Sequence, residues 1–165
     1  MIEVFATRME ITNPGNPLVD TGRFIDHAPK SRNEALASLM RQMNICEERG
    51  SGVDRALTAI EIAQLPAPEF QGESNFTRII LFAYREFKEM SHPDRVRACY
   101  QRCCLCWVLR EFMTNASLRG RFDIKDSNYP MVSKVIKAAQ EAELIKPADP
   151  ENRSPRDRRY IPFWG

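Results

Sequence analysis

Apolar and polar residues alternate at the start of the chain. Ile2 and Val4 precede a short break, and Met9 and Ile11 follow it. A period of two residues is typical of a β-strand with one covered face, so we expect two strands that form a hairpin. The next stretch, residues 13–22, is rich in Pro, Gly and Asn and predicts a loop.

Two helical patterns and a strand follow this loop. Ser31 and Glu34 have the spacing of a capping box, with Ser31 as N-cap, and predict a helix over about 32–43. A second apolar stripe after the glycine turn at 50–52 indicates another helix. Residues 65–75 are expected to form a loop that can include a short strand. The β-branched and aromatic residues that come next predict a strand, so this first segment is β-β-α-α-β.

The second half of the chain predicts three helices and a closing strand. Its elements are expected in this order: a long helix over 94–113, a short helix over 114–122 capped by Thr114 or Asn115, a helix over 131–145, a polar loop rich in Pro and Arg, and a strand over 160–164. This order describes a winged helix-turn-helix. We therefore predict an α+β fold, with a first domain over 1–88 and a winged helix over 92–165.

Composition narrows the class of protein. The chain has 165 residues, 43% of them hydrophobic, which suits one large or two small domains with a real core. No apolar run approaches the ~20 residues that span a bilayer, and no secretory signal is visible, so a cytoplasmic protein without a membrane partner is expected. Residues 1–93 carry 10 basic and 13 acidic residues, whereas 94–165 carry 14 and 9. This asymmetry indicates that the second half meets a polyanion.

Cysteine and histidine give little support for catalysis or metal binding. Cys99, Cys103 and Cys106 share one face of the long predicted helix. Zinc needs four ligands around a tetrahedron, which one helix face cannot supply, so we expect these thiols to pack in the core without metal. The two histidines, His27 and His92, lie in no nucleophile motif. No catalytic residue is predicted.

The glycine turn before the second helix is a candidate phosphate site. The first N–H groups of a helix have no internal partner, and glycine lets a phosphate approach them closely. Against this, Asp54 lies in the first turn, where an acid stabilises the helix by itself and repels phosphate. Spacing alone therefore favours a plain turn.

The predicted helix-turn-helix carries candidate DNA contacts. Residues early in a recognition helix meet base edges, and basic residues on its polar face and in a wing meet phosphates. The residues so placed are Ser127, Asn128 and Tyr129 at the helix start, Ser133, Lys134 and Lys137 on its polar face, and Arg153, Arg156, Arg158 and Arg159 in the wing. A solvated charged surface or a protein-docking module are the alternatives.

Three stretches together resemble a bacterial family. They are "IEVFATRMEITNPGNPLV", "SRNEALASLMRQMNICEERGSGVDRAL" and "CYQRCCLCWVLREFMTNASLRGRF", the last followed later by "YIPFWG". They are similar to the C-terminal part of RecG-related ATP-dependent helicases, also called ATP-binding transcriptional regulators. In whole members a Schlafen-like AlbA domain precedes a segment similar to gyrase and histidine-kinase ATPases, and a winged helix usually follows. The sequence has no Walker A motif.

The resemblance implies a nucleotide site in the first domain. In such ATPases an Asp at the end of a strand contacts adenine, and a later glycine loop covers the phosphates. Here Asn13 takes the place of that Asp, and the implied contacts are Asn13, Gly15, Arg49, Gly50, Ser51 and Gly52. The family's helix with an acid and an Asn for water activation and Mg²⁺ comes before this strand. We therefore expect Met1 to mark the start of a fragment that has no cofactor and does not hydrolyse ATP.

The function expected from these observations is DNA binding by the C-terminal fragment of a transcriptional regulator. Its first domain would sense a ligand or hold two copies together in a homodimer, and duplex DNA would be its partner. Two alternatives stay open. One is an ATP-binding or ATP-hydrolysing protein that is complete only in a full-length parent, with ATP as cofactor. The other is a winged helix that docks another protein.

Overall fold

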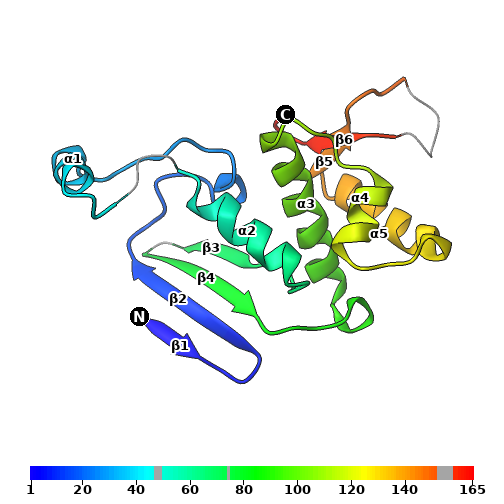
Figure 1. Cartoon of the computed structure of the whole chain (residues 1–165), viewed down its shortest axis with the longest axis horizontal. Helices are drawn as coiled ribbons and strands as arrows, with labels where there is room; N and C mark the ends of the chain where they lie inside the picture. Colours follow the sequence, from blue (N-terminus) through cyan, green and yellow to red (C-terminus); the bar gives the residue numbers. More distant parts are fainter. Residues whose placement is uncertain (47–49, 74, 152–157) are drawn as a thin grey trace.

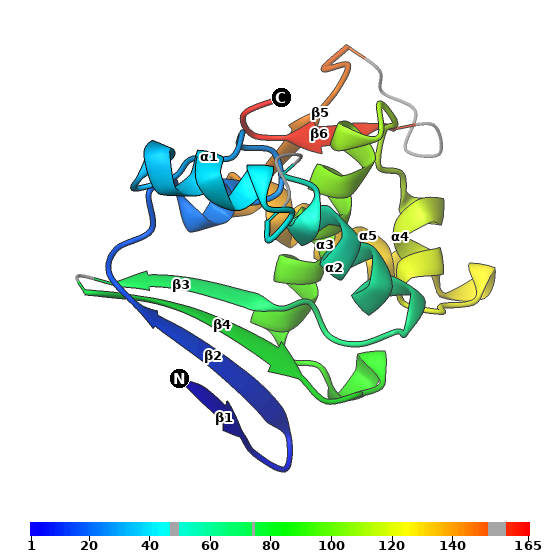
Figure 2. The same ribbon diagram turned by 60° about the vertical axis from the view of Figure 1, so that its left-hand side comes forward.

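The first segment contains a four-stranded antiparallel sheet. In the computed structural model, which describes residues 1–46, 50–73, 75–151 and 158–165, the strand order is β1-β2-β4-β3. The strands are β1 (Ile2–Val4), β2 (Arg8–Pro14), β3 (Glu69–Glu73) and β4 (Phe76–Phe82). Ile2 pairs with Ile11 and Val4 with Met9, so the predicted hairpin is confirmed. β1 is the edge strand farthest from the helical part of the molecule (Figures 1 and 2).

Strand β3 lies within residues 65–75, where the sequence allowed a short strand. It pairs along β4, with Phe70 opposite Ile79 and Gly72 opposite Thr77. Its sequence, EFQGE, has low strand propensity because of its glycine and its two acids. The ladder with β4, a tertiary contact, therefore decides its conformation.

Two helices lie between β2 and β3. The loop before them contains the 3-10 helix η1 (Thr21–Arg23), and the helices are α1 (Glu34–Gln42) and α2 (Gly52–Ile62). The expected N-cap of α1 was wrong by two residues: Asn33 accepts the cap bond from the Leu36 N–H at 3.0 Å, and Ser31 instead donates to the Glu34 side chain. No residue of α1 is buried, and the helix stands apart from the rest of the molecule (Figure 1).

The connection to the second segment contains the 3-10 helix η2 (Phe87–Glu89) and leads into α3 (His92–Val108). Ser91 and Asp94 form a capping box, and Pro93 lies in the first turn, so α3 begins two residues before the expected start. The expected end at residue 113 was too late. Arg110 adopts a left-handed conformation with φ 63°, which ends the helix.

A short helix pair and a second sheet complete the fold. They consist of α4 (Asn115–Arg121), the 3-10 helix η3 (Asp126–Asn128), α5 (Tyr129–Glu141), β5 (Ile145–Pro147) and β6 (Tyr160–Pro162). Thr114 is the N-cap of α4, one of the two caps predicted. Strands β5 and β6 are antiparallel, and Met113 forms a bridge to Tyr160 beside them. Strand β5 was not predicted, because its residues were assigned to the helix end and the polar loop.

One continuous hydrophobic core joins the two segments. Leu57 and Ala67 from the first segment pack in the same cluster as Cys99, Cys103 and Val132 from the second. The apolar side predicted for α5 is confirmed, since Val132, Val135, Ile136 and Ala139 are all buried. Within the described residues, no helix has the length and apolar character needed to cross a membrane.

Candidate nucleic-acid surface and basic groove

The two glycine motifs of the first segment meet in one groove. Asn13 and Gly15 at the end of β2 lie across it from Gly50, which comes just before α2. The groove has a volume of about 440 Å³ and is also lined by three basic side chains, His27, Lys30 and Arg32. Three of the six residues predicted for a nucleotide site are thus brought together although they are far apart in the sequence.

Backbone geometry explains why glycine occupies positions 15 and 50 in the groove wall. Gly15 has φ +93°, and a Cβ there would lie 3.3 Å from the Arg32 guanidinium, which donates to the Asn16 carbonyl. The Gly15 carbonyl accepts from the Thr77 hydroxyl at 3.0 Å. Gly50 has φ +64°, and a Cβ there would lie 2.6 Å from Pro29 Cγ. Both positions require glycine, so the motifs shape the groove wall whatever binds in it.

The other predicted phosphate contacts are placed differently. Ser51 is the N-cap of α2 but makes no side-chain cap bond, and Gly52 has open space around it. Neither belongs to the lining of this groove in the described part of the chain. Arg49 lies outside the described residues. In the first turn of α2, burial raises the pKa of Asp54, and its Oδ1 atom is buried without a hydrogen-bond partner among the described residues.

Hydrogen bonds fix helix α5 against α4. The Asn115 amide donates to the Ser133 hydroxyl at 3.0 Å and to the Tyr129 carbonyl at 3.4 Å. Its oxygen accepts from Arg119 at 2.6 Å, and the Ser133 hydroxyl donates to the Tyr129 carbonyl at 3.2 Å. Ser133 therefore serves the packing of the two helices, a role that the sequence did not indicate.

The remaining residues predicted for α5 lie at its solvent side. Ser127, Asn128, Lys134 and Lys137 are exposed, and Asn128 is the N-cap of α5 without a side-chain cap bond. Lys137 pairs with Glu141 at 3.5 Å. Tyr129 is half-buried, and the Arg119 guanidinium lies over its ring, 5.9 Å from the ring centroid. The start and the polar face of α5 are thus open to a partner.

Two of the four arginines predicted for a wing, Arg158 and Arg159, lie within the described residues. Arg159 is exposed, with its guanidinium 5.5 Å from the centroid of the Phe112 ring, and Arg158 is half-buried. The Arg159 carbonyl accepts from the Ala148 N–H at 2.9 Å and closes the base of the β5–β6 hairpin. Arg153 and Arg156 lie outside the described residues.

The cysteine cluster belongs to the core. Cys99, Cys103, Cys104 and Cys106 are buried, whereas Cys46 is exposed. Burial raises the pKa of all four clustered thiols, which keeps them protonated and unreactive. In the described ranges, no three His, Cys, Asp or Glu side chains are placed to hold a metal ion.

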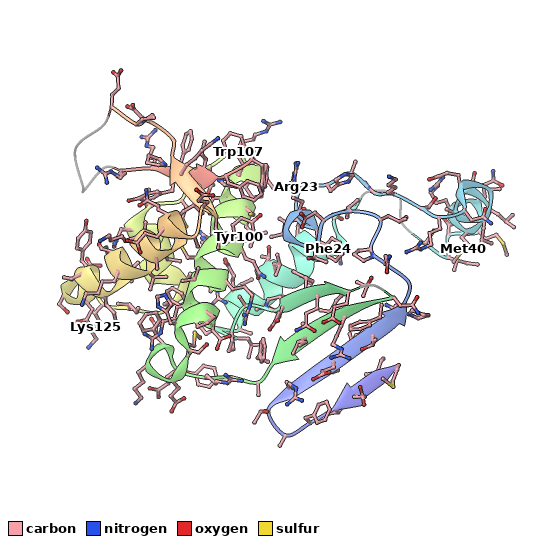
Figure 3. All side chains as sticks on the ribbon, turned by 180° about the vertical axis from the view of Figure 1, so that it is seen from behind. Arg23, Phe24, Met40, Tyr100, Trp107 and Lys125 are labelled. Atoms are coloured by element: carbon pink, nitrogen blue, oxygen red, sulfur yellow. The ribbon has the colours of Figure 1, made fainter. Side chains whose placement is uncertain are left out.

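Sequence reasoning missed the basic side of the groove. His27, Lys30 and Arg32 come from the loop between η1 and α1. This loop runs between Phe24 and Met40, which lie on the side of the molecule away from Lys125 (Figure 3). A signal was available, because three basic residues and a proline stand between the two glycine motifs in the stretch HAPKSR. Only the fold shows that this stretch closes over Gly50 and Gly15.

Comparison with known proteins supports the assignment of the first segment. Residues 1–81 match the model of a family described as "Putative ATP-dependent DNA helicase recG C-terminal". Residues 1–81 are similar to this ATPase-like family. The match contains the whole sheet except the last residue of β4 and both glycine motifs of the groove. The predicted resemblance is therefore confirmed for this segment.

Other comparisons add little. No curated protein matches the chain. A crystal structure of the DIP2311 protein from Corynebacterium diphtheriae is similar at 10% sequence identity, with a TM-score of 0.40, over 94% of this chain and 44% of that chain. The chain thus spans less than half of that protein, and the TM-score is too low to establish a shared fold.

Proposed function

We propose that this chain binds duplex DNA through a winged helix built from α3, α4, α5 and the β5–β6 hairpin. The observation that carries the proposal is the bridge between Met113 and Tyr160. Met113 lies between α3 and α4, so the bridge places this connection beside the two-stranded β5–β6 sheet. A helix, a connection that bridges to the second sheet, two helices and a hairpin, in this order, are the arrangement expected of a winged helix-turn-helix.

The surface of α5 supports a reading role. Its apolar side packs on α3 and α4, which leaves Lys134 and Lys137 exposed on the other side. Such lysines neutralise phosphates, and a short polar side chain at the helix start, here Asn128, approaches base edges. Arg159 at the base of the hairpin adds a further cation. Within a regulator, the first segment would sense a ligand or join two copies of the chain.

The test is fluorescence anisotropy with short labelled duplexes over a series of salt concentrations. Lys134→Ala should weaken binding to all sequences and reduce the salt slope by about one unit. Lys30→Ala removes the same charge from the basic groove and should leave the slope unchanged. Asn128→Ala should change the preference at one base pair by about 1–3 kcal/mol. An absence of wild-type binding at low salt would refute the proposal and favour protein docking.

A second proposal concerns an anion such as a nucleotide phosphate in the basic groove. It rests on the convergence of Lys30, Arg32 and His27 with Gly15 and Gly50. Calorimetric titration with ATP and with inorganic triphosphate tests it and separates base recognition from phosphate recognition. Lys30→Ala should weaken both ligands, and Lys125→Ala, at the far end of the molecule (Figure 3), should weaken neither. Equal affinity of all three proteins would contradict an anion site in this groove.

A further inference from the structure

A buried group of ion pairs connects α2 to both α3 and α4. Glu61, near the C-terminal end of α2, accepts from Arg102 Nη1 on α3 at 2.8 Å. Its other oxygen lies 3.3 Å from Arg121 Nε on α4. The side chains of Glu61 and Arg121 are 13% and 2% exposed. One carboxylate thus holds two helices of the second segment to the first.

The chain directly after α2 is held by the same two helices. Leu65, Ala67 and Pro68 offer backbone carbonyls to side chains of α3 and α4. The bonds are Arg121 Nη2 to Leu65 at 2.6 Å, Arg97 Nε to Ala67 at 3.1 Å and Gln101 Nε2 to Pro68 at 2.7 Å. Pro66 and Pro68 are fully buried. The end of α2 and residues 65–68 therefore form a docking contact rather than a loose linker.

Charge makes this contact depend on Glu61. Burial lowers the pKa of Arg121, and the Glu61 carboxylate is the charge that opposes this effect. Arg121 Nη1 and Arg102 Nε are buried without hydrogen-bond partners among the described residues. Removing the carboxylate would leave the buried guanidinium group of Arg121 without this counter-charge and take the close partner from Arg102, which is 27% exposed; an uncompensated buried charge is far less favourable than the pair itself.

Helix α2 reaches from this contact to the basic groove. Val53, in its first turn, lines the groove together with Gly50, and Glu61 lies two turns further along. A helix of this length is a rigid element. At the other side of the contact, α4 holds α5 through Asn115.

We propose that Glu61 is a positioning residue for the helix pair α4–α5, so that the placement of α2 beside the groove sets the placement of the DNA-reading helix. This inference rests on the proposed DNA binding for its functional consequence. The positional claim itself depends only on the contacts of Glu61, Arg102 and Arg121.

The test is hydrogen exchange by mass spectrometry on the full chain, combined with duplex binding at a temperature at which the variant is folded. Glu61→Gln should speed up exchange in α4 and α5 by about tenfold or more and leave β2 and β4 unchanged, because opening would be local. The binding constant for the duplex should fall about tenfold. Glu34→Gln, on exposed α1, is the matched control and should change neither quantity.

The two readouts separate the inference from the proposed function. Wild-type exchange rates in α4 and α5 of Glu61→Gln would overturn the positioning role, and so would a uniform rise throughout the molecule. If the wild type binds no duplex while Glu61→Gln still loosens α4 and α5, the positioning role holds and DNA binding fails. If Glu61→Gln does not fold, Arg102→Gln, which keeps the Arg121 pair, decides by the same criteria.

Discussion

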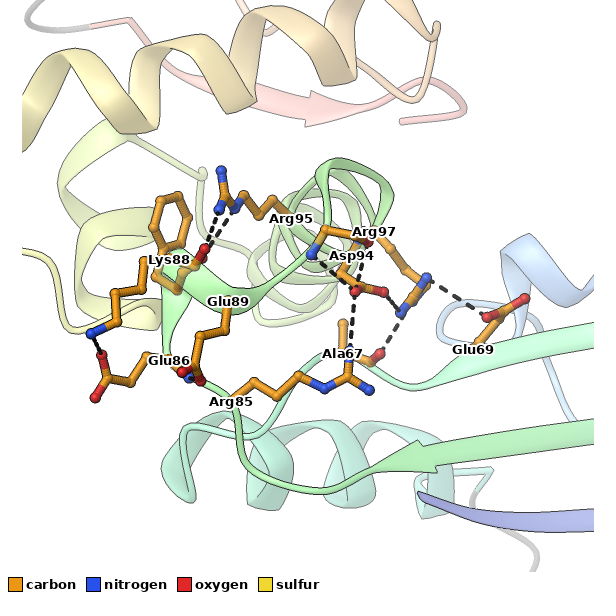
Figure 4. A network of polar contacts seen from close by, with 11 residues as sticks. Ala67, Glu69, Arg85, Glu86, Lys88, Glu89, Asp94, Arg95 and Arg97 are labelled. Atoms are coloured by element: carbon orange, nitrogen blue, oxygen red, sulfur yellow. Dashed lines mark hydrogen bonds and ion pairs between the residues drawn. The ribbon is translucent and has the colours of Figure 1, made fainter. Parts of the chain in front are cut away.

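Asp94 is predicted to stabilise the start of α3, where the connection from the first segment meets the second. It accepts from the Ser91 hydroxyl at 2.7 Å and from the Ser91 N–H at 3.2 Å, which closes the capping box of α3. It also accepts from Arg97 at 2.6 Å and lies 3.7 Å from Arg85 (Figure 4). Its side chain is only 12% exposed. Asp94→Ala removes all of these contacts together.

The expected cost follows from what each contact leaves behind. Ser91 keeps its N-cap bond from the N–H of residue 94, so the change removes only the reciprocal half of the capping box, the bonds from the Ser91 N–H and hydroxyl, which costs about 1 kcal/mol. Arg97 is 18% exposed and would keep the longer pair with Glu69, at 3.8 Å, its bond to the Ala67 carbonyl and its position over the Phe82 ring, but no close carboxylate. A guanidinium that loses its close partner in such a place adds about 1–3 kcal/mol. We expect Asp94→Ala to lower the free energy of unfolding by about 2–4 kcal/mol.

Urea denaturation over a pH series checks both the size and the origin of this effect. Burial alone would raise the pKa of Asp94, but hydrogen bonds from Ser91 and Arg97 and the Arg97 charge hold it below its usual value. The stabilisation is therefore complete above the unfolded-state pKa of about 3.9 and is lost as pH falls through the lower folded-state pKa. The gap between wild type and variant should shrink below about pH 4.

An exposed aspartate in a similar ion pair, Asp126, provides the matched control. Asp126 is 95% exposed and pairs with Arg119 at 3.1 Å, so Asp126→Ala should cost less than about 0.5 kcal/mol. A loss below about 1 kcal/mol for Asp94→Ala, or a gap that does not change with pH, would show that the ion pair and cap do not stabilise the junction.

Three further changes test other parts of the structure. Gly50→Ala should destabilise by about 1–2 kcal/mol or more in urea denaturation, because φ is positive and Pro29 lies where the Cβ would be, whereas Gly52→Ala should be neutral or stabilising. A thiol reagent should label Cys46 quickly in the native protein and the four clustered thiols only after unfolding, since burial raises their pKa. Leu118→Ala, at a fully buried site in α4, should cost about 2–5 kcal/mol in the same denaturation assay.

Periodic patterns in the sequence predicted the elements whose stability is local. The stripe of Val132, Val135, Ile136 and Ala139 indicated both α5 and the side it buries. The end of α3 was missed because Leu109 and Phe112 continue an apolar run, and no Gly or Pro marks the stop at Arg110. Helix ends of this kind are set by a single left-handed residue, which propensity does not identify.

Strand β5, which was not predicted, and the groove both depend on distant parts of the chain. Strand β5 contains a lysine and a proline, and only its pairing with β6 makes it a strand. Gly50 was recognised as a turn residue, but the neighbour that requires glycine there is Pro29, in the loop that precedes α1. Tertiary proximity of this kind has no signature in a single sequence.

The layout of the molecule restricts how a bound anion would influence DNA. The groove is lined by the loops on either side of α1, whereas Lys125, just before η3 and α5, lies at the opposite end of the molecule from Met40 of α1 (Figure 3). A small ligand in the groove therefore cannot touch a duplex on α5, and direct electrostatic effects over such a distance are screened by salt. Any influence has to pass through packed elements. Helix α2 is suited to this, because one of its ends lines the groove and the other carries the carboxylate that holds α3 and α4.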